Sequence, residues 1–89
     1  MKASEEFILR EIAGEYMLVP VGQAAARFNG LIAINEIGSF LFQALGREQT
    51  EDSLVDLIVK EYDIDRETAR NDLQSFLTDL RQLGALIEA

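Results

Sequence analysis

The sequence predicts an α+β fold, in which a three-stranded antiparallel sheet is followed by three helices. The first third of the chain carries short segments rich in apolar and β-branched residues, a pattern typical of strands. From Asn35 onward, apolar residues recur with helical spacing, and a good N-cap residue precedes each of three such segments. Because the connections are short and the chain has 89 residues, we expect one domain over residues 1–89 with winged helix-turn-helix character.

The predicted strands begin with a hairpin. Residues 7–12 and 16–19 are rich in apolar side chains, and Gly14 between them can adopt the positive φ of a tight turn. We interpret residues 21–27 as a loop, because this stretch consists mostly of small residues. A third strand is expected over residues 29–34, where apolar and β-branched residues follow one another.

The first two predicted helices have recognisable ends. Asn35 is the N-cap of the first, and Gly46 ends it. Thr50 caps the second, which continues to Tyr62 with apolar residues spaced at i, i+4. These two segments therefore present one apolar side each to a common core.

The third helix has the strongest signals. Asp65 is its N-cap, Gly84 stands at the expected C′ position, and the apolar tail at 85–87 can add a further strand. Its buried side is expected to consist of Ala69, Leu73, Phe76, Leu80 and Leu83.

The composition excludes most catalytic chemistry. The chain has no Cys and no His, so it lacks thiolate nucleophiles, disulfides, most zinc sites and the usual general base at neutral pH. Asp63, Asp65 and Glu67 cluster at a helix start without the other ligands of a calcium loop, so we assign them to capping and solvation. We therefore expect no enzyme activity, no metal and no cofactor.

Charge and hydropathy limit the partners. No apolar run approaches the about 18–20 residues that span a membrane, and the first residues do not resemble a signal peptide, so we predict a cytoplasmic protein. The net charge of −8 argues against nucleic-acid binding, which depends on neutralising phosphates. It fits either solubility alone or a basic partner.

A basic strip flanks the apolar side of the third helix. On a helical wheel, Arg66, Arg70 and Arg81 share a sector with Gln74 and Leu77. This sector is either a solvated face whose arginines offset nearby acids, or a site for an acidic, partly apolar ligand. DNA is a poor match, because the rest of the protein would repel it.

The third predicted strand has neither Pro nor charge after Arg27. Soluble proteins usually protect a sheet edge with such residues, so an unprotected strand is suited to accept another strand. The alternative is that this segment is ordinary core sheet.

Several segments, in their order and spacing, resemble the PqqD-like family, named for a protein of pyrroloquinoline quinone biosynthesis. These segments are residues 7–22, 28–38, 61–65, 76–77 and 84–86, which together span nearly the whole chain. The resemblance implies a winged helix-turn-helix-like fold and a non-catalytic role in making ribosomally synthesised, post-translationally modified peptides.

Members of the family bind the leader of a precursor peptide as a strand added to the third strand, in the cleft against the third helix. They then present it to a modifying enzyme, often a radical S-adenosylmethionine enzyme. The resemblance thus implies a peptide and an enzyme as partners. From charge and hydropathy we expect no nucleic acid and no membrane partner, and we expect a monomer or weak dimer. The alternative function is that of a winged-helix DNA-binding transcriptional regulator, although such a protein needs a basic wing and Glu11 and Glu15 border the hairpin turn here.

The resemblance also implies where the peptide would lie. Arg66 and Arg70 would attract acidic leader residues, and Leu73 and Leu77 would form an apolar pocket. Carried onto this sequence, the full expected site is Asn29, Gly30, Leu31, Ile32, Ala33, Arg66, Arg70, Leu73 and Leu77.

Overall fold

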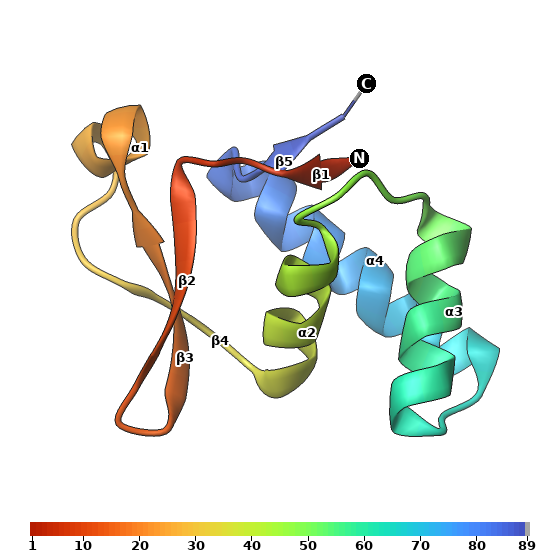
Figure 1. Cartoon of the computed structure of the whole chain (residues 1–89). Coiled ribbons are helices and arrows are strands. Elements are labelled where there is room, and N and C mark those ends of the chain that lie inside the picture. The colour runs from red at the N-terminus through yellow and green to blue at the C-terminus, as the bar shows by residue number, and fades with distance from the viewer. Residues whose placement is uncertain (89) are drawn as a thin grey trace.

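The computed structural model describes residues 1–88 and confirms the α+β fold. Its three-stranded antiparallel sheet has the spatial order β2 (Phe7–Ile12), β3 (Glu15–Pro20), β4 (Ile32–Ile34). Three longer helices lie beside this sheet, with α2 nearest to it and α3 farthest away (Figure 1).

The β2–β3 hairpin closes through the expected tight turn. Ile12 pairs with Glu15, so the loop contains only Ala13 and Gly14. Both residues have positive φ, 53° and 81°, as a type I′ turn requires. Gly14 adopts this conformation without steric cost, and the turn fixes the register of the hairpin.

β4 is shorter than predicted. The expected strand over residues 29–34 is reduced to Ile32–Ile34, with Ile32 opposite Leu18 and Ile34 opposite Tyr16. Gly30 has a φ of 89°, which interrupts the extended chain. The prediction was therefore wrong for Asn29, Gly30 and Leu31, which form an irregular approach to the strand.

A short helix, α1 (Gly22–Arg27), replaces the predicted loop between β3 and β4. Its N-cap residue Val21 gives no side-chain hydrogen bond. Instead, the Glu6 carboxylate accepts a hydrogen bond from the backbone N–H of Ala24, at 2.8 Å. The loop prediction was wrong because a cap that comes from a distant residue leaves no local signal in the sequence.

The three predicted helices are present with the expected caps. They are α2 (Glu36–Ala44), α3 (Glu51–Tyr62) and α4 (Arg66–Leu83). Asn35 Oδ1 accepts from Gly38 N–H at 2.7 Å, and Asp65 accepts from the N–H of Thr68 at the start of α4.

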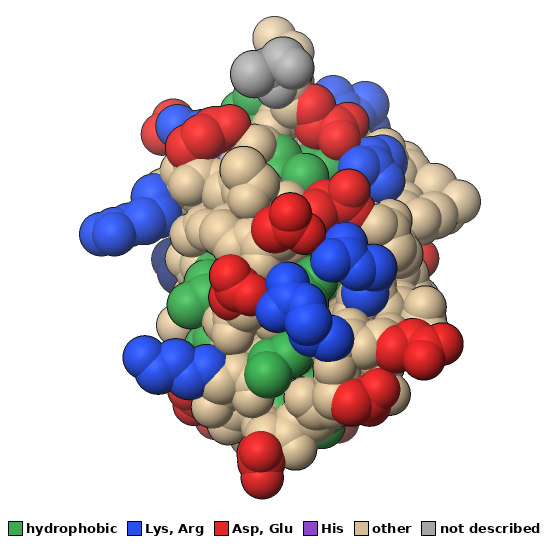
Figure 2. Space-filling model, turned by 90° about the vertical axis from the view of Figure 1, so that its right-hand side faces the viewer, with side chains coloured by type: hydrophobic (Ala, Val, Ile, Leu, Met, Phe, Trp, Pro, Cys, Tyr) green, Lys and Arg blue, Asp and Glu red, His purple; other side chains and the backbone are tan. Residues whose placement is uncertain are grey.

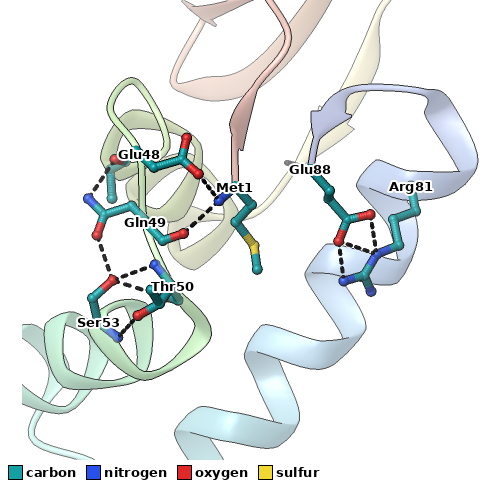
Figure 3. Close-up of polar contacts among 8 residues, drawn as sticks. Met1, Glu48, Gln49, Thr50, Ser53, Arg81 and Glu88 are labelled. Carbon is teal, nitrogen blue, oxygen red and sulfur yellow. Dashed lines mark hydrogen bonds and ion pairs between the residues drawn. The ribbon is translucent and has the colours of Figure 1, made fainter.

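Thr50 and Ser53 form a capping box at the start of α3. Thr50 Oγ1 accepts from the Ser53 N–H at 3.0 Å, and Ser53 Oγ accepts from the Thr50 N–H at 2.9 Å (Figure 3). Two backbone donors of the first turn are thereby satisfied, which fixes where α3 begins.

The apolar tail does add a strand. β5 (Leu86–Ile87) pairs antiparallel with β1 (Lys2–Ala3), so the two ends of the described chain lie side by side (Figure 1). Arg81 on α4 forms a salt bridge with Glu88 just beyond β5, at 2.9 Å (Figure 3). This contact lowers the pKa of the Glu88 carboxyl, chiefly through the hydrogen bond from Arg81.

The core lies between the sheet and the helices. Leu18 of β3 is its most deeply buried strand residue, and α4 contributes one continuous apolar side. Side chains with no solvent exposure include Leu18, Leu41, Leu45, Leu54, Val55, Ile58, Ala69, Leu73 and Leu77. α3 packs against α4 on the side of the core that lies away from the sheet (Figure 1).

Candidate functional site

One edge of β4 is open. β4 pairs with β3 on one side, and within residues 1–88 no segment pairs with its other side. In an antiparallel strand, alternate residues direct their backbone N–H and C=O groups toward each edge, so this edge presents unpaired donors and acceptors. None of Ile32, Ala33 and Ile34 carries a charge that would block an incoming strand.

A groove runs along this edge between β4 and α4. It consists of two hollows of about 320 Å³ and about 280 Å³, which share Ala33, Ile34, Phe76 and Asp79 as lining residues. We call this feature the β4–α4 groove. Its full lining is Leu18, Ile32, Ala33, Ile34, Asn35, Ile37, Gly38, Asp72, Ser75, Phe76, Asp79, Leu80, Gln82 and Leu83.

The register of the sheet decides which side chains enter the groove. Ile32 lies opposite the buried Leu18 and therefore shares its face, and Ile34 follows on the same face two residues later. Ala33 points to the other face, so its backbone rather than its side chain borders the groove. The groove therefore has an apolar wall on the strand side.

Phe76 forms the apolar floor and is held close to the start of α2. A Cβ on Gly38 would lie 3.1 Å from Phe76 Cε1 and 3.4 Å from the Cβ of Ile34. Gly38 is therefore required for the close approach of α2, β4 and the Phe76 ring. Phe76 is half-buried, so part of its ring faces the open groove.

The charged side chains of the groove are acidic. Asp72 and Asp79 stand on either side of Phe76 along α4, and neither takes part in an ion pair within residues 1–88. A third hollow of about 390 Å³ continues past Ala33, Ile34 and Asn35, and its charged residues are Glu15 and Glu36. The groove and its continuation contain no Lys or Arg among their lining residues.

The arginines predicted for the site lie on the opposite flank of α4. Arg66 forms a salt bridge with Asp56 of α3 at 2.6 Å, and Arg70 with Asp52 of α3 at 3.0 Å. Figure 2 shows this side of the molecule, where acidic and basic side chains lie next to one another. Neither Arg66 nor Arg70 is among the residues that line the β4–α4 groove, because the other flank of α4 faces β4.

Leu73 and Leu77 also lie outside the groove. Both have no solvent exposure and belong to the core, so neither side chain reaches the surface where the sequence analysis places a peptide pocket. The helical wheel had placed the centre of the buried side nearer Phe76 and Leu83. Packing against α3 shifts the centre of the buried side of α4 toward Leu77. Phe76 is therefore half-buried and borders the groove.

The remaining predicted residues lie at or near the edge strand. Ile32 and Ala33 line the groove, and Leu31 just before β4 is exposed. Asn29 and Gly30 are exposed in the approach to the strand. Sequence reasoning missed Asp72, Asp79 and Gln82, although their positions on the wheel, beside Phe76 and Leu83, carried a signal.

Residues 1–88 contain neither of two other kinds of site. They hold no group of three or more His, Cys, Asp or Glu side chains placed to bind a metal ion. No helix among residues 1–88 combines the length and apolar character needed to cross a membrane.

A solved structure shares this architecture. The structure of TbiB1 in complex with the TbiA(beta) leader peptide is similar to this chain, with a TM-score of 0.76 and 26% sequence identity. The match covers 100% of this chain and 98% of that one. No curated protein matches the sequence. The family model described as coenzyme PQQ synthesis protein D (PqqD) matches residues 8–86, and this chain therefore belongs to the PqqD family.

Proposed function

We propose that the chain binds the leader segment of a ribosomally made precursor peptide, as a strand added to β4 in the β4–α4 groove. The observation that carries this proposal is the open, uncharged edge of β4 beside the groove. TbiB1, whose fold is similar, has been seen with a leader peptide bound. A peptide added at such an edge gains main-chain hydrogen bonds, while the groove provides specificity for its side chains.

The proposed contacts differ from those expected from the sequence. The backbone of β4 would pair with the peptide, and Ile32, Phe76 and Leu83 would contact its apolar side chains. The exposed Leu31 offers a further apolar contact at the start of the strand. Arg66 and Arg70 have no direct part in this site, because both reach toward α3.

The chain itself performs no chemical step in this proposal. It holds the leader in an extended form and presents the precursor to a separate modifying enzyme, for which the family resemblance suggests a radical S-adenosylmethionine enzyme. Modification of the precursor by that enzyme is expected to slow when the chain is omitted, because the leader is then bound less often.

DNA binding as a regulator is not supported by the charges on α4. The open flank of this helix carries Asp72 and Asp79, which would repel phosphates. The arginines of the other flank are already paired with Asp52 and Asp56. A winged-helix regulator needs the reverse arrangement, with basic side chains exposed on its recognition helix.

Strand addition can be tested with a peptide selected on the full chain from a displayed random library. Each backbone amide of the selected peptide is then N-methylated in turn, and affinity is measured for each version. Methylated amides that face β4 lose a hydrogen bond, so we expect affinity to fall about 3- to 10-fold at every second position. Amide shifts of the labelled chain should concentrate at residues 32–34 and 72–83.

Two results would contradict the proposal. Shifts that fall on α3 or the hairpin turn instead would place the peptide elsewhere. Affinity losses without alternation along the peptide would mean that it binds by side chains alone and does not add a strand.

A further inference from the structure

We propose that the β4–α4 groove selects a leader segment that carries a Lys or Arg side chain next to apolar residues, and that this cation packs on Phe76 and contacts Asp72 or Asp79. This inference rests on the proposed function, since it names the chemistry of the peptide bound there. The groove and the open strand edge define the site. The two carboxylates determine that the bound leader segment carries a positive charge.

The charges on α4 are divided between its two flanks. Arg66 and Arg70 are neutralised by α3, and Arg81 by Glu88. On the flank facing β4, Asp72 and Asp79 have no cationic partner within residues 1–88. This division leaves uncompensated negative charge at the groove, which a cation on the peptide would compensate.

The shape of the groove also suits a long cationic side chain. Along one flank of α4, Asp72, Phe76 and Asp79 occupy positions i, i+4 and i+7. Phe76 therefore lies between the two carboxylates. A Lys or Arg stem can pack on the Phe76 ring while its charged end reaches Asp72 or Asp79. The face of the ring adds a favourable contact with the cation.

The two ends of the groove differ in charge, which gives the peptide a direction. The end near Asn35 continues into the hollow with Glu15 and Glu36. Beyond Leu83 at the other end, a guanidinium nitrogen of Arg27 lies 3.5 Å from the place of a Cβ on Gly84. The cationic residue of the leader is therefore expected at the Asp72 end, away from Arg27.

Selection from the displayed random library gives the first readout. Peptides selected on the full chain at low salt should be enriched in Lys or Arg at one position beside an apolar residue. The double variant Asp72→Asn/Asp79→Asn tests the cause of the enrichment. We expect it to bind the selected peptide about 3- to 30-fold more weakly, and a version with Gln at the cationic position should lose a similar amount on the wild-type chain.

A matched control separates local contact from overall charge. Asp52→Asn/Asp56→Asn makes the same two chemical changes and the same change in net charge on α3, where the two carboxylates pair with Arg66 and Arg70. We expect this variant to bind the selected peptide within about twofold of the wild type. At an ionic strength of about 1 M, the difference between the two double variants should shrink, because the Debye length falls to about 3 Å.

The outcomes distinguish this inference from the proposed function. Selected peptides that shift the amides of residues 32–34 but carry no Lys or Arg, or that bind the Asp72→Asn/Asp79→Asn variant unchanged, overturn the charge preference and leave strand addition standing. If no peptide is selected, or selected peptides shift amides elsewhere, both proposals fail. If the two double variants lowered the affinity for the selected peptide equally, net charge alone would explain the loss, and the assigned contact would be overturned.

Discussion

At the scale of single residues, Gly38 controls how close α2 comes to the groove. A Cβ at this position would lie 3.1 Å from both Phe76 Cε1 and Asn35 Oδ1. We expect Gly38→Ala to push the Phe76 ring into the groove and to weaken peptide binding. Alanine's helix propensity, worth about 1 kcal/mol, offsets much of the packing cost, so the free energy of unfolding should fall by only about 1 kcal/mol. Peptide titration and thermal unfolding measure the two effects.

Gly46→Ala is the matched control for that change. A Cβ there would lie 3.1 Å from the backbone oxygen of Gln43, away from the residues that line the groove. Its effect should appear in stability and leave peptide affinity unchanged. If Gly38→Ala also left the affinity unchanged, the position of Phe76 would have no part in binding.

Asp65 makes the start of α4 sensitive to acid. Its hydrogen bond with the Thr68 side chain holds the pKa of the Asp65 carboxyl below its usual 3.8. The ionised form therefore stabilises the fold above the unfolded pKa, and this contribution is lost as pH falls through the folded pKa. Asn keeps the capping oxygen without the charge. We expect Asp65→Asn to be less stable than the wild type at neutral pH.

Urea unfolding across the acid range measures this difference. The gap between wild type and Asp65→Asn should close as pH falls from 3.8 through the lower pKa of the folded state, because below that pKa the wild-type carboxyl is protonated in both states. A gap of constant size at every pH would show that the charge of Asp65 contributes nothing to stability.

At the scale of elements, the α3–α4 interface explains where the arginines belong. Arg70 and its partner Asp52 are both substantially exposed, so their salt bridge contributes little to stability. We expect Arg70→Gln to lower the free energy of unfolding by less than about 1 kcal/mol and to leave peptide affinity unchanged. Denaturant unfolding measures the stability of this variant, and peptide titration compares its affinity with that of Asp79→Asn. A loss of affinity as large as that of Asp79→Asn would place Arg70 in the binding site.

The elements themselves were largely predictable from local signals. Asn35, Thr50 and Asp65 all cap helices as expected, and the Gly14 turn sets the hairpin. One exception is α1, whose first turn is completed by the carboxylate of Glu6, a residue far away in sequence. A cap of this kind depends on the tertiary fold, so no pattern within residues 21–27 predicts it.

At the scale of the whole molecule, the location of the candidate site was predictable but its chemistry was not. The uncharged third strand indicated an edge that could accept another strand, and the family resemblance implied a cleft between that strand and the last helix. A helical wheel shows which residues share a flank, but it does not show which flank faces the sheet. Packing of α4 against α3 turns Arg66 and Arg70 away and brings Asp72 and Asp79 to the groove. The proposed ligand therefore carries a basic residue, whereas the sequence analysis expects an acidic one.

The most direct test of strand addition is a solution structure of the chain with a peptide selected on it. We expect nuclear Overhauser contacts between the peptide backbone and the backbone of residues 32–34, in the alternating pattern of paired strands. The peptide's side chains on one face should contact Phe76 and Leu83 of the groove. Contacts confined to α3 or to the β2–β3 hairpin, with the edge of β4 still open, would contradict the account.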